Sequence, residues 1–281
     1  MYWRSVAAWT SSGKPGHPIG AGGGVGSANH QYDVMNVPPL SHENPLVREL
    51  RDLHRPEGRR TAQALLVEGR RAIDGFLDAG WRADLLLHPL DETPPPTWID
   101  ARPVSAKAAA RLTQASTPSG WFARFPLPTP PPLNPLIGGL VLAEIADPGN
   151  LGTLIRSAAA FGIAQVVVIG GADPWGNKAV QASAGSLAAV ALHILSPEQG
   201  LAPLAGASRA ALVVAGGADP ATIPLIPRWL VVGSEAHGVR DEWLSLCDER
   251  LTLPMHGRVE SLNAAVAGAI ACYVLMQRNT R

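Results

Sequence analysis

Five largely apolar runs in the second half of the chain constrain its fold more than any other feature. They span residues 140–145, 165–169, 211–215, 230–232 and 251–253, and segments with helical spacing of apolar residues separate them. Runs without polar alternation are typical of strands buried on both faces, which occur in parallel sheets covered by crossover helices. We therefore expect an α/β fold with a mostly parallel sheet, and a ligand at the carboxyl ends of its strands.

The first half of the chain predicts a second, smaller α/β unit. Its first helix begins at Pro45 with Asn44 as the N-cap, because proline suits the first helical position and an asparagine side chain can accept a hydrogen bond there. Leu46, Leu50 and Leu53 then form one apolar stripe. The elements expected to follow are a strand at 62–67, a helix at 70–79 and a strand at 83–87.

A proline-rich stretch at 127–136 separates the two units. Proline fixes φ and removes a hydrogen-bond donor, so this stretch is predicted to be a stiff, extended linker. Residues 1–40 carry a glycine run but no apolar periodicity, and no strand pattern precedes the run, so a disordered tail is expected rather than a dinucleotide loop. The predicted domains are an accessory domain at 41–126 and a larger domain at 137–281.

Charge and cysteine content limit the classes of function. The 23 basic and 23 acidic side chains balance, so any affinity for nucleic acid must come from a local patch. The only cysteines, Cys247 and Cys272, form no CxxC pair and lie near no histidine cluster, which predicts no metal site and a reducing, cytoplasmic location. The longest uncharged segment, 261–276, is shorter than the roughly 20 residues of a membrane helix, so we expect no membrane association.

The best candidate for a basic patch lies in the accessory domain. Arginines outnumber acidic residues between positions 48 and 71, and such a cluster would attract a nucleic-acid backbone. The candidate nucleic-acid-binding residues are Arg55, Arg59, Arg60, Arg70 and Arg71. A solvated helix face with ordinary ion pairs explains the same composition equally well.

The first of three candidate functional segments, 147–162, follows the first predicted strand of the larger domain. Asn150 is expected to cap a helix there, Gly162 to end it, and Arg156 to lie off its apolar stripe. That stripe comprises Leu151, Leu154, Ile155 and Ala158. An arginine beside strand ends suits an anionic ligand, although a surface salt bridge is the commoner role for such a residue.

The second segment, 229–238, is a buried strand that runs into a glycine-bounded turn. Gly233 has no side chain, so a ligand could approach the backbone closely at the strand end. Glu235 is expected at the rim of that site, although an acidic residue also suits the start of a helix. His237 has the chemistry of a general base, but a lone histidine in a turn is more often solvated, and we assign it no role.

The third segment, 251–263, leads into the last predicted helix. Ser261 is expected to cap that helix, which presents small residues that permit close contact with another helix. The small residues are Ala264, Ala267, Gly268 and Ala271. Packing within one subunit and a dimer seam are both consistent with this surface.

Together the three segments resemble the SpoU (TrmH) family of RNA ribose 2′-O-methyltransferases, within the SPOUT superfamily. The family signatures have the forms N-x-G-x-x-x-R, G-x-E-x-x-G and P-M-x-G-x-x-x-S-L-N. The matching residues here are Asn150, Gly152 and Arg156, then Gly233, Glu235 and Gly238, then Pro254, Met255, Gly257, Ser261, Leu262 and Asn263. The order and spacing of the three motifs make the resemblance specific. Two departures, Ala236 for a common glycine and Ala264-Ala265 for a Val-Ser pair, remove no reactive group.

The resemblance implies a deep trefoil knot in the larger domain and an S-adenosylmethionine cofactor held through backbone groups, with S-adenosylhomocysteine as the product. The implied cofactor-binding residues are Gly233, Leu253, Met255, Ser261 and Leu262. A homodimer, in which Arg156 of the partner subunit completes each site, is also implied. The segment Leu-Leu-Val-Glu68-Gly69-Arg70 resembles the family's ribosomal-protein-like substrate-binding domain. The expected partner is therefore RNA, with ribosomal (23S) RNA preferred to transfer RNA.

Methyl transfer to a ribose hydroxyl requires alignment of donor and acceptor and activation of the hydroxyl. The implied catalytic residues are Arg156, Glu235, Asn263 and Asn150. A guanidinium keeps its proton in proteins, so we expect Arg156 to bind phosphate and favour the developing alkoxide rather than act as a base. Glu235 and Asn263 would orient Arg156 and the ribose, with Asn150 holding the loop. A non-catalytic RNA-binding protein of this fold is the alternative, whereas a generic nucleotide-binding enzyme would need a P-loop or GxGxxG motif that the sequence lacks.

Overall fold

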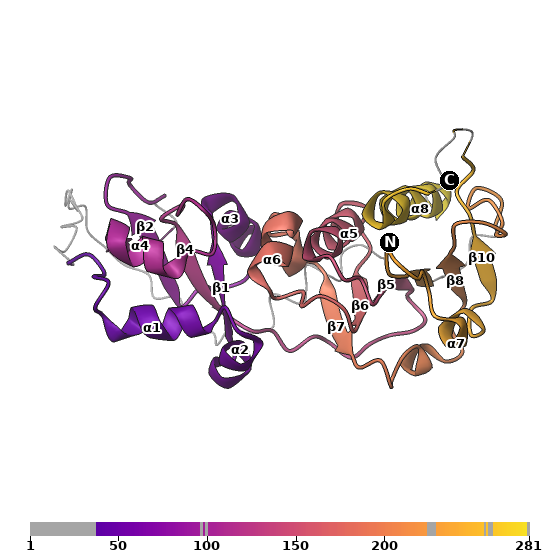
Figure 1. Ribbon diagram of the computed structural model, residues 1–281, viewed down its shortest axis with the longest axis horizontal. Coiled ribbons are helices and arrows are strands. Elements are labelled where there is room, and N and C mark those ends of the chain that lie inside the picture. The colour runs from indigo at the N-terminus through magenta and orange to yellow at the C-terminus, as the bar shows by residue number, and fades with distance from the viewer. Residues whose placement is uncertain are drawn as a thin grey trace, which may run out of the picture.

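The computed structural model describes residues 38–95, 98, 101–223, 229–255, 257 and 261–279. Two β-sheets organise this part of the chain, and they follow one another along the long axis of the molecule (Figure 1). We call the smaller sheet and its helices the N-terminal unit, and the larger sheet and its helices the C-terminal unit. Most of the predicted tail, residues 1–37, lies outside the described residues.

The N-terminal unit is a mixed sheet with helices on both faces. Its strands have the order β1-β4-β2-β3, in which β4 is antiparallel to both neighbours and β3 is parallel to β2. The strands are β1 (Ala64–Glu68), β2 (Leu85–Pro89), β3 (Arg102–Val104) and β4 (Phe122–Pro126). Side chains alternate along β1, because Leu65 packs in the same core as Phe76, whereas Leu66 packs in a separate core with Leu50.

The first helix of this unit begins as predicted. Asn44 Oδ1 accepts a hydrogen bond from Leu46 N–H at 3.0 Å, and proline occupies the first helical position. The strand predicted from residue 62 starts later, because Ala62 ends a short helix and Gln63 adopts a left-handed φ of 49°. That short helix has no apolar stripe from which it could have been predicted. The helices are α1 (Pro45–Asp52), α2 (Pro56–Ala62), α3 (Arg70–Asp78) and α4 (Ala106–Leu112).

The C-terminal unit contains the parallel sheet that the apolar runs predicted. Its strands have the order β10-β8-β9-β5-β6-β7, and every neighbouring pair is parallel. The strands are β5 (Gly139–Ala143), β6 (Gln165–Ile169), β7 (Ala191–Leu195), β8 (Arg209–Leu212), β9 (Trp229–Val232) and β10 (Glu249–Leu251). The sequence pattern did not predict β7, because His193 interrupts its apolar run.

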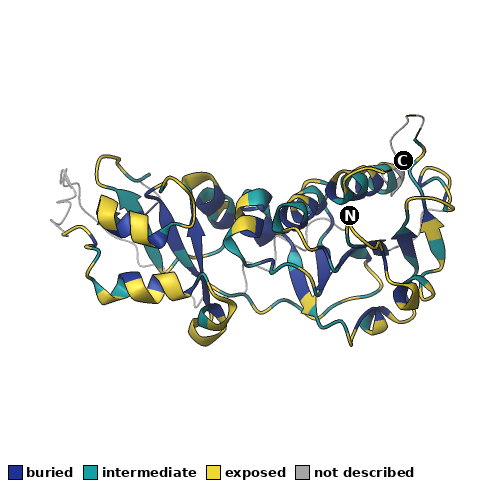
Figure 2. Cartoon of the chain, in the orientation of Figure 1, coloured by how far each residue is buried: buried dark blue, intermediate teal, exposed yellow. Residues whose placement is uncertain are grey.

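Helices cover both faces of the parallel sheet. On one face α5, α6 and α8 continue the row of helices that α3 begins, and on the other lie α7 and η2 (Figure 1). These elements are α5 (Pro148–Ala160), α6 (Asn177–Ser183), η1 (Ser186–Ala189), η2 (Ala202–Leu204), α7 (Asp241–Leu244) and α8 (Ala264–Asn279). The apolar stripe predicted for α5 is fully buried, and Gly162 follows the helix end with a φ of 73°. Figure 2 shows that buried positions concentrate in the central strands and the inner sides of the helices.

None of the helices in the described ranges combines the length and the apolar character needed to cross a lipid bilayer.

Candidate active site

The three candidate segments meet at the carboxyl edge of the parallel sheet. The first follows β5, the second follows β9, and the third ends at the start of α8. Asn150 Nδ2 donates to Glu235 Oε1 at 2.7 Å, and Asn263 Nδ2 donates to Asn150 Oδ1 at 3.1 Å. Three side chains from distant parts of the sequence therefore form one chain of hydrogen bonds, which we call the polar chain.

The start of α8 sets the direction of the polar chain. Asn263 Oδ1 accepts hydrogen bonds from the backbone N–H groups of Ala265 at 2.9 Å and Val266 at 3.2 Å. Because the oxygen of an amide accepts hydrogen bonds and its nitrogen donates them, this cap leaves Nδ2 of Asn263 to face Asn150. Asn150 must then accept with its oxygen and donate with its nitrogen, which suits an ionised carboxylate at Glu235.

Two of the predicted helix caps are wrong, and the correct caps explain the polar chain. The N-cap of α5 is Asp147, whose Oδ1 accepts a hydrogen bond from Asn150 N–H at 2.7 Å. Pro148 occupies the first helical position because it has no N–H to satisfy, so the cap precedes it and Asn150 lies inside the first turn. At α8 the capping oxygen belongs to Asn263 and not to Ser261. The Asn150 side chain is therefore free to reach the other two segments.

Glu235 is a solvent-facing carboxylate held by several donors. Its Oε2 accepts a hydrogen bond from Ala146 N–H at 3.3 Å. Partial burial raises the pKa of Glu235, but hydrogen bonds from Asn150 and from the backbone of Ala146 and Asp147 outweigh this effect, and the pKa lies below its ordinary value of 4.5. Glu235 is thus ionised at neutral pH and can accept further hydrogen bonds.

Two motif glycines are required by the packing of the chain itself. A Cβ on Gly233 would lie 2.1 Å from the carbonyl carbon of Gly238, because the turn after β9 folds back on its own start. Reciprocal backbone hydrogen bonds of 3.0 and 2.9 Å between Ser234 and Gly238 close that turn. A Cβ on Gly152 would lie 2.3 Å from the carbonyl oxygen of Ala179 in α6. Both positions therefore exclude a side chain independently of any ligand.

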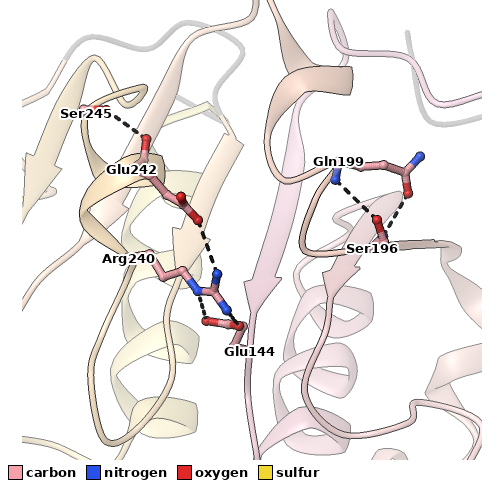
Figure 3. Close-up of polar contacts among 6 residues, drawn as sticks. All are labelled: Glu144, Ser196, Gln199, Arg240, Glu242 and Ser245. Carbon is pink, nitrogen blue, oxygen red and sulfur yellow. Dashed lines mark hydrogen bonds and ion pairs between the residues drawn. The ribbon is translucent and has the colours of Figure 1, made fainter.

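A second link joins the turn after β9 to the loop after β5, and it was not predicted. Arg240 donates to both carboxylate oxygens of Glu144, with an Nε–Oε2 distance of 2.6 Å (Figure 3). Its guanidinium also lies over the ring of Trp243. Glu144 has a φ of 57°, a conformation that residues other than glycine rarely adopt. Arg240 and Glu235 thus tie one turn to the same loop at two points. The sequence offered one sign of this link, because the acidic Glu144 interrupts the end of the apolar run 140–145.

The candidate cofactor-binding residues lie on the second and third segments, and their backbone groups are unused. Gly233 is buried at the end of β9, and Leu253 and Met255 are half-buried after β10. Ser261 and Leu262 are exposed before α8. Within the described ranges, no hydrogen bond uses the backbone N–H or C=O of these residues, which are Gly233, Leu253, Met255, Ser261 and Leu262. Unused backbone groups at strand ends fit a cofactor bound through backbone contacts.

Arg156 stands apart from the other three candidate catalytic residues. It is exposed on α5, and in the part of the chain that the structure describes no hydrogen bond or ion pair joins it to the polar chain. One subunit therefore brings together Asn150, Glu235 and Asn263 but leaves the Arg156 guanidinium available to an external anion. Completion of each site by Arg156 of the partner subunit stays a prediction.

The candidate basic patch needs one correction. Arg59 is only 4% exposed, and its guanidinium pairs with Asp173 of the C-terminal unit, so it is not available to nucleic acid. Its role could not be read from composition, because its ion-pair partner lies in the other unit. The four exposed members of the patch are Arg55, Arg60, Arg70 and Arg71. Arg60 and Arg70 each form an ion pair within their own helix.

Comparison with known proteins identifies the family. The model of the SpoU rRNA Methylase family matches residues 139–273, and that of the MRM3-like substrate binding domain matches residues 44–123. RlmP of Bacillus subtilis strain 168, a 23S rRNA (guanosine(2553)-2′-O)-methyltransferase, is 32% identical over 248 residues, which cover 84% of this chain and 97% of RlmP. The chain belongs to the SpoU family.

Solved structures of RNA methyltransferases have the same fold as this family member. The AdoMet-bound rRNA methyltransferase of Sinorhizobium meliloti superposes with a TM-score of 0.73 at 26% identity, over 85% of this chain and 96% of that one. A crystal structure of an RNA 2′-O ribose methyltransferase superposes with a TM-score of 0.74 at 26% identity, over 86% of this chain and 98% of that one. Both similarities extend over the N-terminal and the C-terminal units. The SpoU assignment therefore holds for the whole arrangement and not for the parallel sheet alone.

Proposed function

We propose that this SpoU family member transfers a methyl group from S-adenosylmethionine to a ribose 2′-hydroxyl of ribosomal RNA and releases S-adenosylhomocysteine. The observation that carries the proposal is the polar chain, which holds an ionised Glu235 beside unused backbone groups at the carboxyl edge of the sheet. RlmP, which acts on 23S rRNA, supports ribosomal RNA as the substrate class. Such a substrate places the enzyme in the cytoplasm, where ribosomes are assembled.

In this proposal the residues of the chain bind, orient and polarise the acceptor. When bound, S-adenosylmethionine supplies an electrophilic methyl group on its sulfonium. Glu235 accepts a hydrogen bond from the incoming ribose or from Arg156, because each of its oxygens retains a free lone pair. Arg156 stabilises the negative charge that develops on the acceptor oxygen, since a guanidinium stays protonated and cannot serve as the base. The proton of the ribose hydroxyl would pass to solvent water as its oxygen takes up the methyl group. Asn150 and Asn263 keep the Glu235 carboxylate in position.

The proposal includes a homodimer that buries one face of α8. Val266, Ile270 and Tyr273 recur at helical spacing on that face and are 47%, 40% and 50% exposed, and Leu262 precedes them at 37%. An apolar stripe of this size on a helix is typical of an interface between subunits. Ile270→Arg is expected to give a monomer in light scattering and to lose methylation, because Arg156 of the partner subunit no longer completes the site. A monomeric variant with full activity would contradict that role.

The trefoil knot is also part of the proposal. β10 lies at the outer edge of the sheet, whereas Asn263, which follows it in the sequence, bonds to Asn150 beside the central strand β5. A chain that returns from the edge to the centre in this way supports a knotted path.

Transfer of tritiated methyl groups to unmodified ribosomal RNA tests the proposed function. Arg156→Ala is expected to abolish labelling while calorimetry shows unchanged cofactor binding, whereas Leu262→Arg is expected to abolish both. A wild-type protein that shifts RNA in a gel without labelling it would instead be a non-catalytic RNA-binding protein. Equal loss of cofactor affinity in the two variants would contradict the division between acceptor and cofactor groups. Mapping of ribose methylation in a deletion strain would then identify the nucleotide.

A further inference from the structure

A partly buried ion pair, between the buried Arg59 and the half-buried Asp173, joins the N-terminal unit to the C-terminal unit. Arg59, in the last turn of α2, donates to Asp173 Oδ2, and its Nη1 donates to the Leu53 carbonyl oxygen at 2.7 Å. The other oxygen of Asp173 accepts a hydrogen bond from Trp175 N–H at 2.9 Å. One guanidinium therefore holds the end of α1, the helix α2 and a loop of the parallel sheet together.

That loop belongs to the same edge of the sheet as the candidate active site. It follows β6 and turns at Gly170 and Gly171, which have φ values of 59° and 72°. Ala172 N–H donates to the Ile145 carbonyl oxygen at 2.8 Å, and a Cβ on Gly171 would lie 2.4 Å from the same oxygen. The neighbouring Ala146 N–H donates to Glu235. A continuous series of contacts thus runs from the N-terminal unit to the polar chain.

The two units also pack closely away from this ion pair. Trp81 Nε1 donates to the Ala188 carbonyl oxygen at 3.0 Å, and the side chain of Gln181 donates to the backbone of β1. A Cβ on Gly185 would lie 2.6 Å from the Ala72 carbonyl oxygen, so the backbones of η1 and α3 touch. Residues of both units belong to one apolar core. Direct contacts, and not the 127–136 linker alone, therefore hold the two units together.

From this arrangement we infer that Arg59 and Asp173 form a specificity-determining pair, which sets the distance and angle between RNA bound by the N-terminal unit and the methyl-transfer site. The inference rests on the proposed function. An ion pair that is wholly or partly buried is weak evidence for stability, because the cost of removing charges from water offsets much of their attraction. Its directional hydrogen bonds do, however, select one docking geometry, and a misplacement of about 1 Å at a reacting centre can cost about 100-fold in rate.

The discriminating variant is Asp173→Asn, with Asp219→Asn as its matched control. The asparagine introduced by the first substitution keeps an acceptor for Trp175 N–H but loses the charge that pairs with Arg59. Asp219 makes the same kind of turn, with Oδ1 accepting from Ala221 N–H at 2.8 Å, and no ion pair in the described ranges involves it. Both variants therefore keep their own turn, and only the first disturbs the contact between units.

For Asp173→Asn we expect kcat/KM with the target RNA to fall about tenfold to 100-fold, methylation to spread to neighbouring nucleotides, and the Kd for S-adenosylmethionine to stay unchanged. Asp219→Asn and a six-residue Gly-Ser insertion after Pro132 are expected to retain wild-type rate and target. Wild-type selectivity in Asp173→Asn, or target selection that changes with linker length, would overturn the inference.

A distance measurement that does not depend on enzyme activity distinguishes failure of this inference from failure of the proposed function. Spin labels on cysteines introduced at the exposed positions Glu49 and Ala160 report the distance between the units. The native thiols are expected to label slowly, because burial raises the pKa of Cys247 to about 11 and that of Cys272 to about 12. We expect one narrow distance in the wild type and a broader distribution in Asp173→Asn. A wild-type protein inactive on every RNA would refute the proposed function, and an unchanged distribution in the variant would refute the pair.

Discussion

The side-chain amide of Asn263 makes one set of hydrogen bonds with its oxygen and another with its nitrogen. The substitution Asn263→Asp should therefore separate the effect on stability from the effect on activity. The side-chain oxygen caps α8 through hydrogen bonds to Ala265 and Val266, and the nitrogen donates to Asn150. Aspartate keeps the acceptor but replaces the donor with a second acceptor. Asn150 then faces two carboxylates and can donate to only one of them in its present geometry, so Glu235 loses its 2.7 Å hydrogen bond whenever Asn150 turns to the new aspartate.

The two effects differ in size. An aspartate at a helix N-terminus keeps the cap and gains about 0.3–1 kcal/mol from the helix dipole, which offsets part of the lost hydrogen bond to Asn150. The free energy of unfolding is therefore expected to stay within about 1 kcal/mol of the wild type, whereas Asn263→Ala loses about 1 kcal/mol of capping as well. A hydrogen bond to a charged group contributes about 1.5–3 kcal/mol, so mispositioning of Glu235 is expected to lower kcat about tenfold to 100-fold.

Thermal unfolding and single-turnover methyl transfer on the same preparations measure both effects. The expected pattern is a near-wild-type Tm with a large loss of rate for Asn263→Asp, and losses of both for Asn263→Ala. Full activity in Asn263→Asp would refute the role of the polar chain. A drop in Tm equal to that of Asn263→Ala would refute the capping assignment.

Three further predictions follow from the geometry of the site. Gly152→Ala is expected to destabilise the fold by about 1–3 kcal/mol in chemical denaturation, because its Cβ would lie 2.3 Å from a carbonyl oxygen of α6. Gly257→Ala should be neutral, because a Cβ there meets no atom of the described residues within 4 Å. Arg240→Ala should lower both Tm and activity. Glu144→Gly should lower activity with a smaller loss of Tm, because glycine removes the backbone strain of the positive φ of 57° at position 144. Equal losses of Tm in the two variants would contradict this reason. The pKa of Glu235 is lowered below 4.5, so the ionised carboxylate stabilises the fold at neutral pH, and this stabilisation is lost only as pH falls through the lowered pKa. The pH profile of kcat/KM should therefore show no Glu235 titration between about pH 5 and pH 8. An acid limb in that range that Glu235→Gln removes would contradict this prediction.

The sequence by itself determined the parallel sheet, the buried face of α5 and the position of the three motifs at strand ends. Each of these features depends on local order: continuous apolar runs bury both faces of a strand, and a repeat of about 3.6 residues buries one side of a helix. Asn44 was correctly predicted as a cap for the same reason, since the capping side chain and the Leu46 N–H that donates to it lie in one turn. The strand β7 was not predicted, because one histidine breaks its local pattern.

Only the tertiary structure decided which side chains meet. Asn150 and Ser261 were reasonable caps by type, but Pro148 fixes the start of α5 one turn earlier, and Asn263 takes the α8 cap and so fixes the direction of the polar chain. Arg59 resembled its exposed neighbours in sequence, but in the folded chain it is buried and pairs with Asp173 of the other unit. The physical reason is that hydrogen bonds and burial between distant segments depend on how the sheets and helices pack, and no local period in the sequence records that packing.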